Sequence, residues 1–165
     1  NFAVLNNLPI LFVCENNLYS VYTPIHQRQP NRPITSLAKG YGIRSFRTDG
    51  NDCRKVYELS KEIIGAVRAG KGPAFVEFLT YRWREHCGPN YDNNIGYRAE
   101  DEFKRWQKKC PVDRLKEYAL LNKLIKPPEI IKMETQIQKE IDIAVTLAQA
   151  APVAHDMSLN EAYAL

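Results

Sequence analysis

A cluster of polar residues, Glu15-Asn16-Asn17, follows an apolar run and could bind a metal ion. The side-chain oxygen of Asn17 and the backbone carbonyl of Tyr19 are neutral oxygen ligands, which Mg²⁺ accepts, usually together with substrate phosphates. Two neutral ligands do not hold the ion alone, and Asn is also a common turn residue. Taken by itself, the pattern leaves a simple polar turn as the alternative.

A second cluster, Tyr81-Arg82-Trp83-Arg84-Glu85-His86, could bind a phosphate group and move a proton. The guanidinium of Arg82 carries forked donors that suit a diphosphate, and His86 could transfer a proton or donate to a developing charge. The alternative is a surface Arg in an ion pair beside a structural His. Residues 87–98 follow as a long loop rich in Gly, Pro and Asn, which could be an ordered lid or a flexible connection.

A parallel sheet would bring these two clusters to one edge. Residues 10–14 and 74–80 have the length and the β-branched or aromatic content of buried parallel strands, and each segment ends just before one of the clusters. A further strand is predicted over residues 43–47. Because ligands of open parallel sheets bind beyond the carboxyl ends of the strands, we expect the two clusters to lie close together.

Helices between these strands complete an α/β fold. Val56, Leu59, Ile63 and Val67 recur at helical spacing after Asp52, a candidate N-cap, and a short helix is expected over residues 36–40. Parallel strands need crossover connections, so we predict a parallel sheet with helices on both faces. Beyond residue 98 only helical patterns remain. We therefore predict a helical C-terminal portion, with one domain over residues 1–150 and a C-terminal tail over 151–165.

Composition and charge exclude several classes of partner. The formal net charge of +4 comes from 23 Lys and Arg against 19 Asp and Glu, and the basic residues are scattered, so nucleic-acid binding is not indicated. No stretch reaches the ~18 apolar residues that a membrane span needs. The four cysteines are widely separated and form no C-x-x-C pair, which favours a reducing, cytoplasmic location. The first residue is Asn1 within an apparent helix end, so we expect a fragment of a longer chain.

The first polar cluster and the apolar run before it resemble a known family motif. Leu8-Pro9-Ile10-Leu11-Phe12-Val13-Cys14-Glu15-Asn16-Asn17-Leu18-Tyr19-Ser20 is similar to the second half of the thiamine-diphosphate motif in E1 α subunits of 2-oxo acid and acetoin dehydrogenases. The likeness covers nearly the whole chain and continues at Thr23-Pro24, Asp49-Gly50-Asn51-Asp52, Gly70-Lys71-Gly72-Pro73, Thr80-Tyr81-Arg82-Trp83-Arg84-Glu85-His86 and Gly96-Tyr97-Arg98.

The resemblance implies a thiamine-diphosphate-binding fold and a role for particular residues. Asn17 and Tyr19 would provide the side-chain and backbone oxygens to the Mg²⁺ that bridges the cofactor's diphosphate. Arg82 would contact that diphosphate. His86 would stand near the reactive end of the cofactor and serve in acyl transfer to lipoamide. Residues 97 and 98 would belong to the loop that orders over bound cofactor and presents the site to an acyl-carrying E2 partner.

Two departures limit what the resemblance implies. The first half of the motif, Gly-Asp-Gly, supplies the charged Mg²⁺ ligand and does not occur in this sequence, so we expect weak cofactor binding by this chain alone. Pyruvate-type α subunits carry a small residue before the active-site His and, when regulated, a Ser after it, whereas this chain has Glu85 and Cys87. The form Arg84-Glu85-His86 is similar to acetoin-type and related bacterial enzymes, which points away from pyruvate.

The function implied is oxidative decarboxylation of a 2-oxo acid such as pyruvate, or cleavage of acetoin, with acyl transfer to a lipoyl-bearing E2. A β subunit would complete the site in an α₂β₂ assembly. One alternative is a stand-alone thiamine-dependent lyase or synthase that does not use lipoamide. Another is a noncatalytic interaction module with the same fold.

Overall fold

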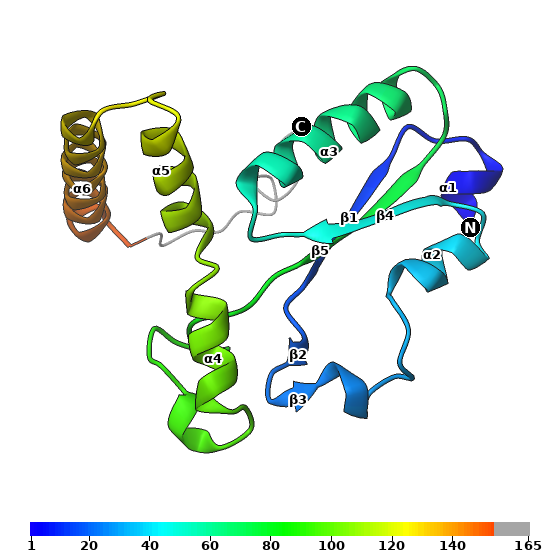
Figure 1. Ribbon diagram of the computed structural model, residues 1–165, viewed down its shortest axis with the longest axis horizontal. Coiled ribbons are helices and arrows are strands. Elements are labelled where there is room, and N and C mark those ends of the chain that lie inside the picture. The colour runs from blue at the N-terminus through cyan, green and yellow to red at the C-terminus, as the bar shows by residue number, and fades with distance from the viewer. Residues whose placement is uncertain (154–165) are drawn as a thin grey trace. The chain divides into compact units, whose positions relative to one another are not determined.

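The computed structural model describes residues 1–153 of the chain (Figure 1). The chain divides into two compact units, Asn1–Tyr118 and Ala119–Leu165, and each is described by itself. The domain range 1–150 stays a prediction. Most of the expected tail, residues 154–165, lies outside the described residues.

A parallel three-stranded sheet forms the centre of the first unit. Its strands are β1 (Leu11–Asn16), β5 (Ala74–Leu79) and β4 (Arg44–Asp49), hydrogen-bonded in the order β1-β5-β4. These are the three strands expected from the sequence, displaced by one or two residues. The predicted α/β class is therefore confirmed.

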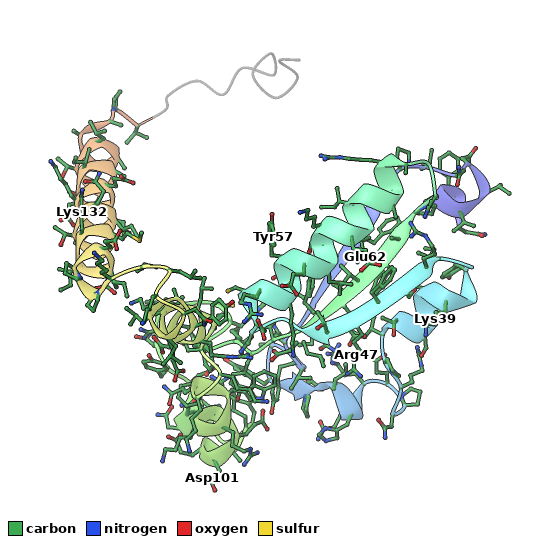
Figure 2. The ribbon with its side chains drawn as sticks, turned by 45° about the horizontal axis from the view of Figure 1, so that its top comes forward. Lys39, Arg47, Tyr57, Glu62, Asp101 and Lys132 are labelled. Atoms are coloured by element: carbon green, nitrogen blue, oxygen red, sulfur yellow. The ribbon has the colours of Figure 1, made fainter. Side chains whose placement is uncertain are left out.

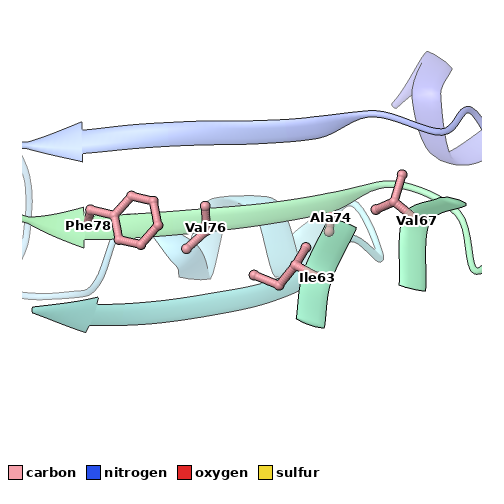
Figure 3. Close-up of a cluster of buried hydrophobic side chains, with 5 residues drawn as sticks. All are labelled: Ile63, Val67, Ala74, Val76 and Phe78. Carbon is pink, nitrogen blue, oxygen red and sulfur yellow. The ribbon is translucent and has the colours of Figure 1, made fainter. Parts of the chain in front are cut away.

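The helix α3 (Cys53–Arg68) covers one face of the sheet and forms the hydrophobic core with it. Asp52 caps this helix as expected, because its side chain accepts a hydrogen bond from the backbone N–H of Lys55 at 3.3 Å. Alternate residues of β5 point toward the helix. Figure 3 shows the five buried side chains of this core, Ile63, Val67, Ala74, Val76 and Phe78.

The helix α2 (Thr35–Gly40) lies on the opposite face. Glu77 is the neighbour of Val76 in β5, so its side chain points away from α3. The Glu77 carboxylate accepts a hydrogen bond from the backbone N–H of Thr35 at 3.2 Å, which fixes the start of α2 on that side. Helices on both faces of the sheet are therefore confirmed.

The expectation that the first strand is buried was wrong for part of it. β1 is an edge strand of the described sheet, and the side chains of Phe12 and Val13 are 39% and 54% exposed. The apolar composition of residues 10–14 predicts cover on both faces of the strand, but the described residues supply it only in part. The short helix α1 (Phe2–Leu5) precedes this strand, as expected.

The turn after β4 approaches the end of β5 closely. The backbone N–H of Gly50 donates to the carbonyl of Leu79 at 2.7 Å. A Cβ atom at position 50 would lie 2.9 Å from that carbonyl oxygen, so only glycine fits without a backbone shift. The turn is held from the other side by Arg114, which donates to Asp49 and Asp52 at 2.9 and 3.2 Å.

The connection after β1 contains short elements rather than long ones. A two-residue antiparallel pair, β2 (Tyr19–Ser20) and β3 (Thr23–Pro24), is followed by the 3-10 turn η1 (Ile25–Gln27). Another 3-10 turn, η2 (Asn93–Ile95), lies in the loop after β5. The sequence predicts both segments as loops with little periodicity, because Pro, Gly and Asn interrupt any regular pattern.

Within the described residues, the elements that follow residue 98 are all helices, as predicted. They are α4 (Glu100–Gln107), α5 (Pro111–Leu121) and, in the second unit, α6 (Pro127–Ala150). Three carboxylates in the first turn of α4 complement the helix dipole, and two prolines open α6. No helix in the described residues is both long and apolar enough to cross a membrane.

Candidate functional site

A pocket lies at the carboxyl ends of β1 and β5, where the two polar clusters meet. Its volume is about 260 Å³, and its lining contains both Asn17 from the first cluster and Arg82 from the second. The parallel pairing of the strands brings the clusters together. Asn16 lies opposite Leu79, and the backbone N–H of Thr80 donates to the carbonyl of Asn16 at 3.0 Å. The expected meeting of the clusters is therefore confirmed.

The remaining lining residues are Glu15, Thr80 and Tyr81. Glu15 has no role in the sequence predictions, although it belongs to the first cluster. Its position could have indicated it, because Glu15 is near the carboxyl end of β1, two residues before Asn17, where ligands of parallel sheets bind. Its carboxylate makes the pocket more polar than the two predicted residues alone would.

A tight turn after β1 sets the position of Asn17. The backbone N–H of Tyr19 donates to Oδ1 of Asn17, and that of Leu18 donates to Oδ1 of Asn16, both at 3.0 Å. Leu18 has a φ of 71°, which is strained for a side chain other than glycine. Oδ1 of Asn17 keeps a second lone pair for another partner. The turn therefore holds the predicted metal ligands of residues 17 and 19 close together.

The guanidinium of Arg82 is fixed on two sides. Its Nε donates to the carbonyl of Arg84 at 2.8 Å, and one terminal nitrogen donates to the carbonyl of Val21 and to the hydroxyl of Tyr97, both at 3.1 Å. The same nitrogen lies 3.6 Å from a carboxylate oxygen of Asp92. The other terminal nitrogen, Nη1, has no partner within residues 1–153, so it is available to an anion.

A buried ion pair closes the loop after Arg82. The Arg98 guanidinium donates to Asp92 at 2.6 Å, and both residues are almost fully buried, at 5% and 1% exposure. Tyr97 donates to the second oxygen of Asp92 at 2.8 Å. Arg98 also donates to the carbonyls of Arg82 and Trp83, at 2.6 and 3.3 Å. Each charge thus has several partners, which offset the cost of its burial and connect Arg98 to the start of the loop.

The ion pair between Asp92 and Arg98 is absent from the sequence predictions. A lone carboxylate in a loop rich in Asn and Gly carries no signal of burial, so Asp92 reads as a solvated turn residue. The available signal is the concentration of three Arg and three Tyr within residues 81–98, since buried cations recruit a carboxylate. Arg98 is held inside the loop by these contacts, and its place in the loop that presents the site to an E2 partner stays a prediction.

Aromatic rings surround this part of the site. The ring of Tyr19 meets those of Tyr81 and Tyr97 edge to face, at centroid distances of 6.3 and 5.4 Å, and its hydroxyl donates to Glu102 at 2.8 Å. Burial and the Glu102 carboxylate raise the pKa of Tyr19, and burial raises the pKa of Tyr81 to about 12. Both phenols are therefore neutral at physiological pH. Tyr19 is a packing group and a donor, whereas the buried hydroxyl of Tyr81 has no hydrogen-bond partner within residues 1–153.

His86 is exposed and does not line the pocket. The residues before His86 are hydrogen-bonded to those after it. Arg84 donates to the carbonyl of Pro89 at 2.9 Å, and Glu85 accepts from the backbone N–H of Asn90 at 3.2 Å. The described residues thus bring residues 17, 19 and 82 together and leave His86 at the surface. Its predicted role in acyl transfer stays a prediction.

The site fits one end of a cofactor that carries a diphosphate and a divalent cation. It offers amide and carbonyl oxygens at residues 17 and 19 and a free guanidinium nitrogen on Arg82, which suit Mg²⁺ and phosphate respectively. Within residues 1–153, no group of three or more His, Cys, Asp or Glu side chains could hold a metal ion by itself. A metal ion held by residues 17 and 19 would take further ligands from phosphate oxygens.

Comparison with known proteins places the chain beside one group of enzymes. The family described as dehydrogenase E1 component matches residues 1–156. The chain is 36% identical to the chloroplastic pyruvate dehydrogenase E1 component subunit alpha-3 of Arabidopsis thaliana, over 92% of this chain and 35% of that protein. It is 31% identical to the 2-oxoisovalerate dehydrogenase subunit alpha of Bacillus subtilis, over 99% of this chain and 49% of that protein.

A third relative is the mitochondrial 2-oxoisovalerate dehydrogenase subunit alpha of Mus musculus. It is 38% identical over 73% of this chain and 27% of that protein. The chain thus spans between about a quarter and a half of the length of these relatives.

Proposed function

The chain belongs to the dehydrogenase E1 component family, and from this premise we propose that it forms the diphosphate-binding part of an α subunit that decarboxylates a 2-oxo acid. The observation that supports the proposal is the pocket shared by Asn17 and Arg82 at the carboxyl ends of β1 and β5. That position is where ligands bind in open parallel sheets.

In this proposal each end of the pocket binds one part of the cofactor. Asn17 and the backbone carbonyl of Tyr19 bind Mg²⁺, while Nη1 of Arg82 binds a diphosphate oxygen. Thiamine diphosphate, when bound, supplies the carbon nucleophile and the electron sink that decarboxylation requires. The chain's own residues bind and orient the cofactor, and the aromatic rings of Tyr19 and Tyr81 exclude water beside it.

The loop closed by Asp92 and Arg98 acts as the support of Arg82. Arg98 binds the backbone carbonyl of Arg82, and Asp92 lies 3.6 Å from its guanidinium. These contacts fix the side chain before a ligand arrives, so little rotamer freedom is lost on binding. Tyr97 and Arg98 thus order the loop beside the cofactor and shape the surface offered to a lipoyl-bearing E2.

The substrate and the assembly belong to the proposal as well. The relatives are named for pyruvate and for 2-oxoisovalerate, and the Arg84-Glu85-His86 form keeps acetoin as a further substrate to test. A β subunit completes the site in an α₂β₂ assembly and contributes what this chain lacks. The four cysteines are free thiols, which accords with a cytoplasmic, reducing location.

The function is tested by dye reduction with the full-length chain and its β subunit in the presence of thiamine diphosphate and Mg²⁺. Pyruvate, branched-chain 2-oxo acids and acetoin are compared as substrates. We expect turnover with at least one of them. Bound cofactor without turnover on any of these substrates would contradict the dehydrogenase assignment and favour a lyase or synthase.

His86→Ala separates acyl transfer from cofactor binding. We expect unchanged affinity for thiamine diphosphate, because His86 does not line the pocket, but severely reduced transfer to lipoamide. Asn94→Ala is the matched control, since Asn94 is exposed in the same loop. Transfer at the normal rate by the His86→Ala enzyme would reassign this residue to a structural role.

A further inference from the structure

A second pocket lies on the face of the sheet opposite α3. Its volume is about 220 Å³, and it is lined by residues 25, 26 and 29–33 of the connection after β3 together with Leu18 and side chains of the sheet. None of its lining residues belongs to the pocket of Asn17 and Arg82. The proposed function therefore leaves this pocket without a role.

A fully buried carboxylate organises the pocket. Glu77 has no exposed surface, and its oxygens accept hydrogen bonds from Nδ2 of Asn16 at 2.8 Å and from the backbone N–H of Thr35 at 3.2 Å. Nε of Arg47 lies 3.4 Å from the same carboxylate. The negative charge of Glu77 is thus satisfied within the protein, and it fixes Arg47 through one side of the guanidinium.

Two arginines present free donors to the pocket. Arg47, labelled in Figure 2, is on β4 on the side that faces η1, and within residues 1–153 its two terminal nitrogens have no hydrogen-bond partner. Arg32 enters from the connection, is half-buried, and likewise has no partner for its guanidinium in the described part of the chain. Two guanidinium groups whose terminal nitrogens have no acceptor in one cavity are an arrangement that binds an anion.

Charge and shape narrow the class of anion. The two arginines set against Glu77 leave one net positive charge, which matches a monovalent anion better than a phosphate dianion. Leu18, Ile25 and two prolines form an apolar part of the lining, beside the polar side chains of Asn16, His26, Gln29 and Asn31, so the cavity also accepts a small apolar group. The volume lies below the roughly 300 to 1,000 Å³ of sites for drug-sized ligands, which indicates a small molecule.

We propose that this pocket binds a small aliphatic monocarboxylate, held by the guanidinium groups of Arg32 and Arg47. The carboxylate lies between the two arginines, and the short hydrocarbon part packs on Leu18 and Ile25. Glu77 acts as a positioning residue, because it orients Arg47 and limits the net charge. The site is independent of thiamine diphosphate.

Calorimetric titration of the full-length protein with butyrate, without thiamine diphosphate, tests the site. We expect saturable binding that Arg32→Gln weakens by about tenfold or more, because a charge-assisted contact is lost. Arg28→Gln is the matched control: Arg28 is exposed in the same connection, lies outside the pocket, and its change alters the net charge equally. Arg47→Lys keeps the charge but loses the forked donors, so we expect weaker binding with an unchanged melting temperature.

Two further ligands define the chemistry. Butyramide has the same shape as butyrate without the charge, and we expect it not to bind. Inorganic phosphate should bind more weakly than butyrate. Equal butyrate affinity in the Arg32→Gln and Arg28→Gln proteins would overturn the site, and tighter binding of phosphate than of butyrate would overturn its assignment to a carboxylate.

Discussion

The sheet and the loop of residues 82–98 are held together by different interactions. The sheet is stabilised by apolar side chains of α3 and β5, of which Ile63 and Val76 are almost fully buried. The loop has little regular secondary structure and is stabilised by charge, with Asp92 bound to Arg98, Tyr97 and Arg82. Apolar burial gives a core that tolerates changes of pH and salt, whereas a buried ion pair gives a fixed geometry that fails when one partner is removed.

The difference matters because the pocket joins the two regions. Asn17 follows a strand of the sheet, and Arg82 begins the loop. Changes in the core should lower the stability of the whole first unit, while changes in the ion pair should release the loop and leave the sheet intact.

The largest effect is expected from Asp92→Ala. Removing this carboxylate leaves the buried charge of Arg98 without its partner, which costs about 3–5 kcal/mol. Hydrogen exchange should show faster exchange of the amides of residues 82–98 and unchanged protection of β5. Asp101→Ala is the control, because Asp101 is exposed at the first turn of α4. Exchange rates in the loop that match those of the control would show that the ion pair does not hold it.

A somewhat smaller effect is expected from Ile63→Ala. The change removes a fully buried side chain from the core and should lower the free energy of unfolding of the first unit by about 2–4 kcal/mol. Ile64→Ala on the same helix is the control, since Ile64 is 37% exposed and should lose about 1 kcal/mol or less. Urea denaturation measures both. Equal losses in the two proteins would contradict the packing of α3 on the sheet.

The smallest effect is expected from Arg114→Ala, which removes an ion pair with Asp49 at the end of β4. Burial acts to raise the pKa of Asp49, but the backbone N–H of Asn51 and the guanidinium of Arg114 hold that pKa below its ordinary value of 3.8. Arg114→Ala should therefore raise the pKa of Asp49 and cost about 1 kcal/mol at neutral pH, because the ion pair is partly exposed.

The pH dependence of this change has a definite sign. A carboxyl group with a lowered pKa in the folded state stabilises the fold at pH values above its unfolded pKa, and the contribution is lost as the pH falls through the folded value. The difference in unfolding free energy between the natural protein and Arg114→Ala should be constant near neutral pH and shrink below about pH 4. A difference that does not change down to pH 2 would show that Asp49 is not the partner.

The sequence predicts the sheet better than the loop for the same physical reason. Apolar periodicity is visible along residues 53–68, so α3 and its core could be anticipated, and parallel pairing followed from the need for crossover connections. The strand order β1-β5-β4 was not predicted. Asp92 and Arg98 come together because the irregular backbone of the loop bends back on itself. No periodic pattern in the sequence predicts such a contact. Tyr19 likewise reads as a backbone ligand only, although its side chain joins a cluster of rings with Tyr81 and Tyr97.

Sequence patterns predicted some of the neighbours of the strand residues and missed others. Asn17 and Arg82 were expected near each other because both follow parallel strands, and the structure confirms it. The exposure of Phe12 and Val13 was not expected, because their apolar character predicts cover that the described residues do not provide. Glu77 reads as a solvated residue of a strand, yet it is fully buried among polar partners from three other elements of the chain.

The assignment of Arg82 to a diphosphate is tested most directly by calorimetric titration of the full-length protein, assembled with its β subunit, with thiamine diphosphate and Mg²⁺. Arg82→Ala should weaken cofactor binding by about 1.5–3 kcal/mol, since it removes a charge-assisted contact. Arg84→Ala removes the same charge two residues away and retains the backbone carbonyl that binds Arg82, so its affinity should be unchanged. Equal affinities of the Arg82→Ala and Arg84→Ala proteins would contradict the site.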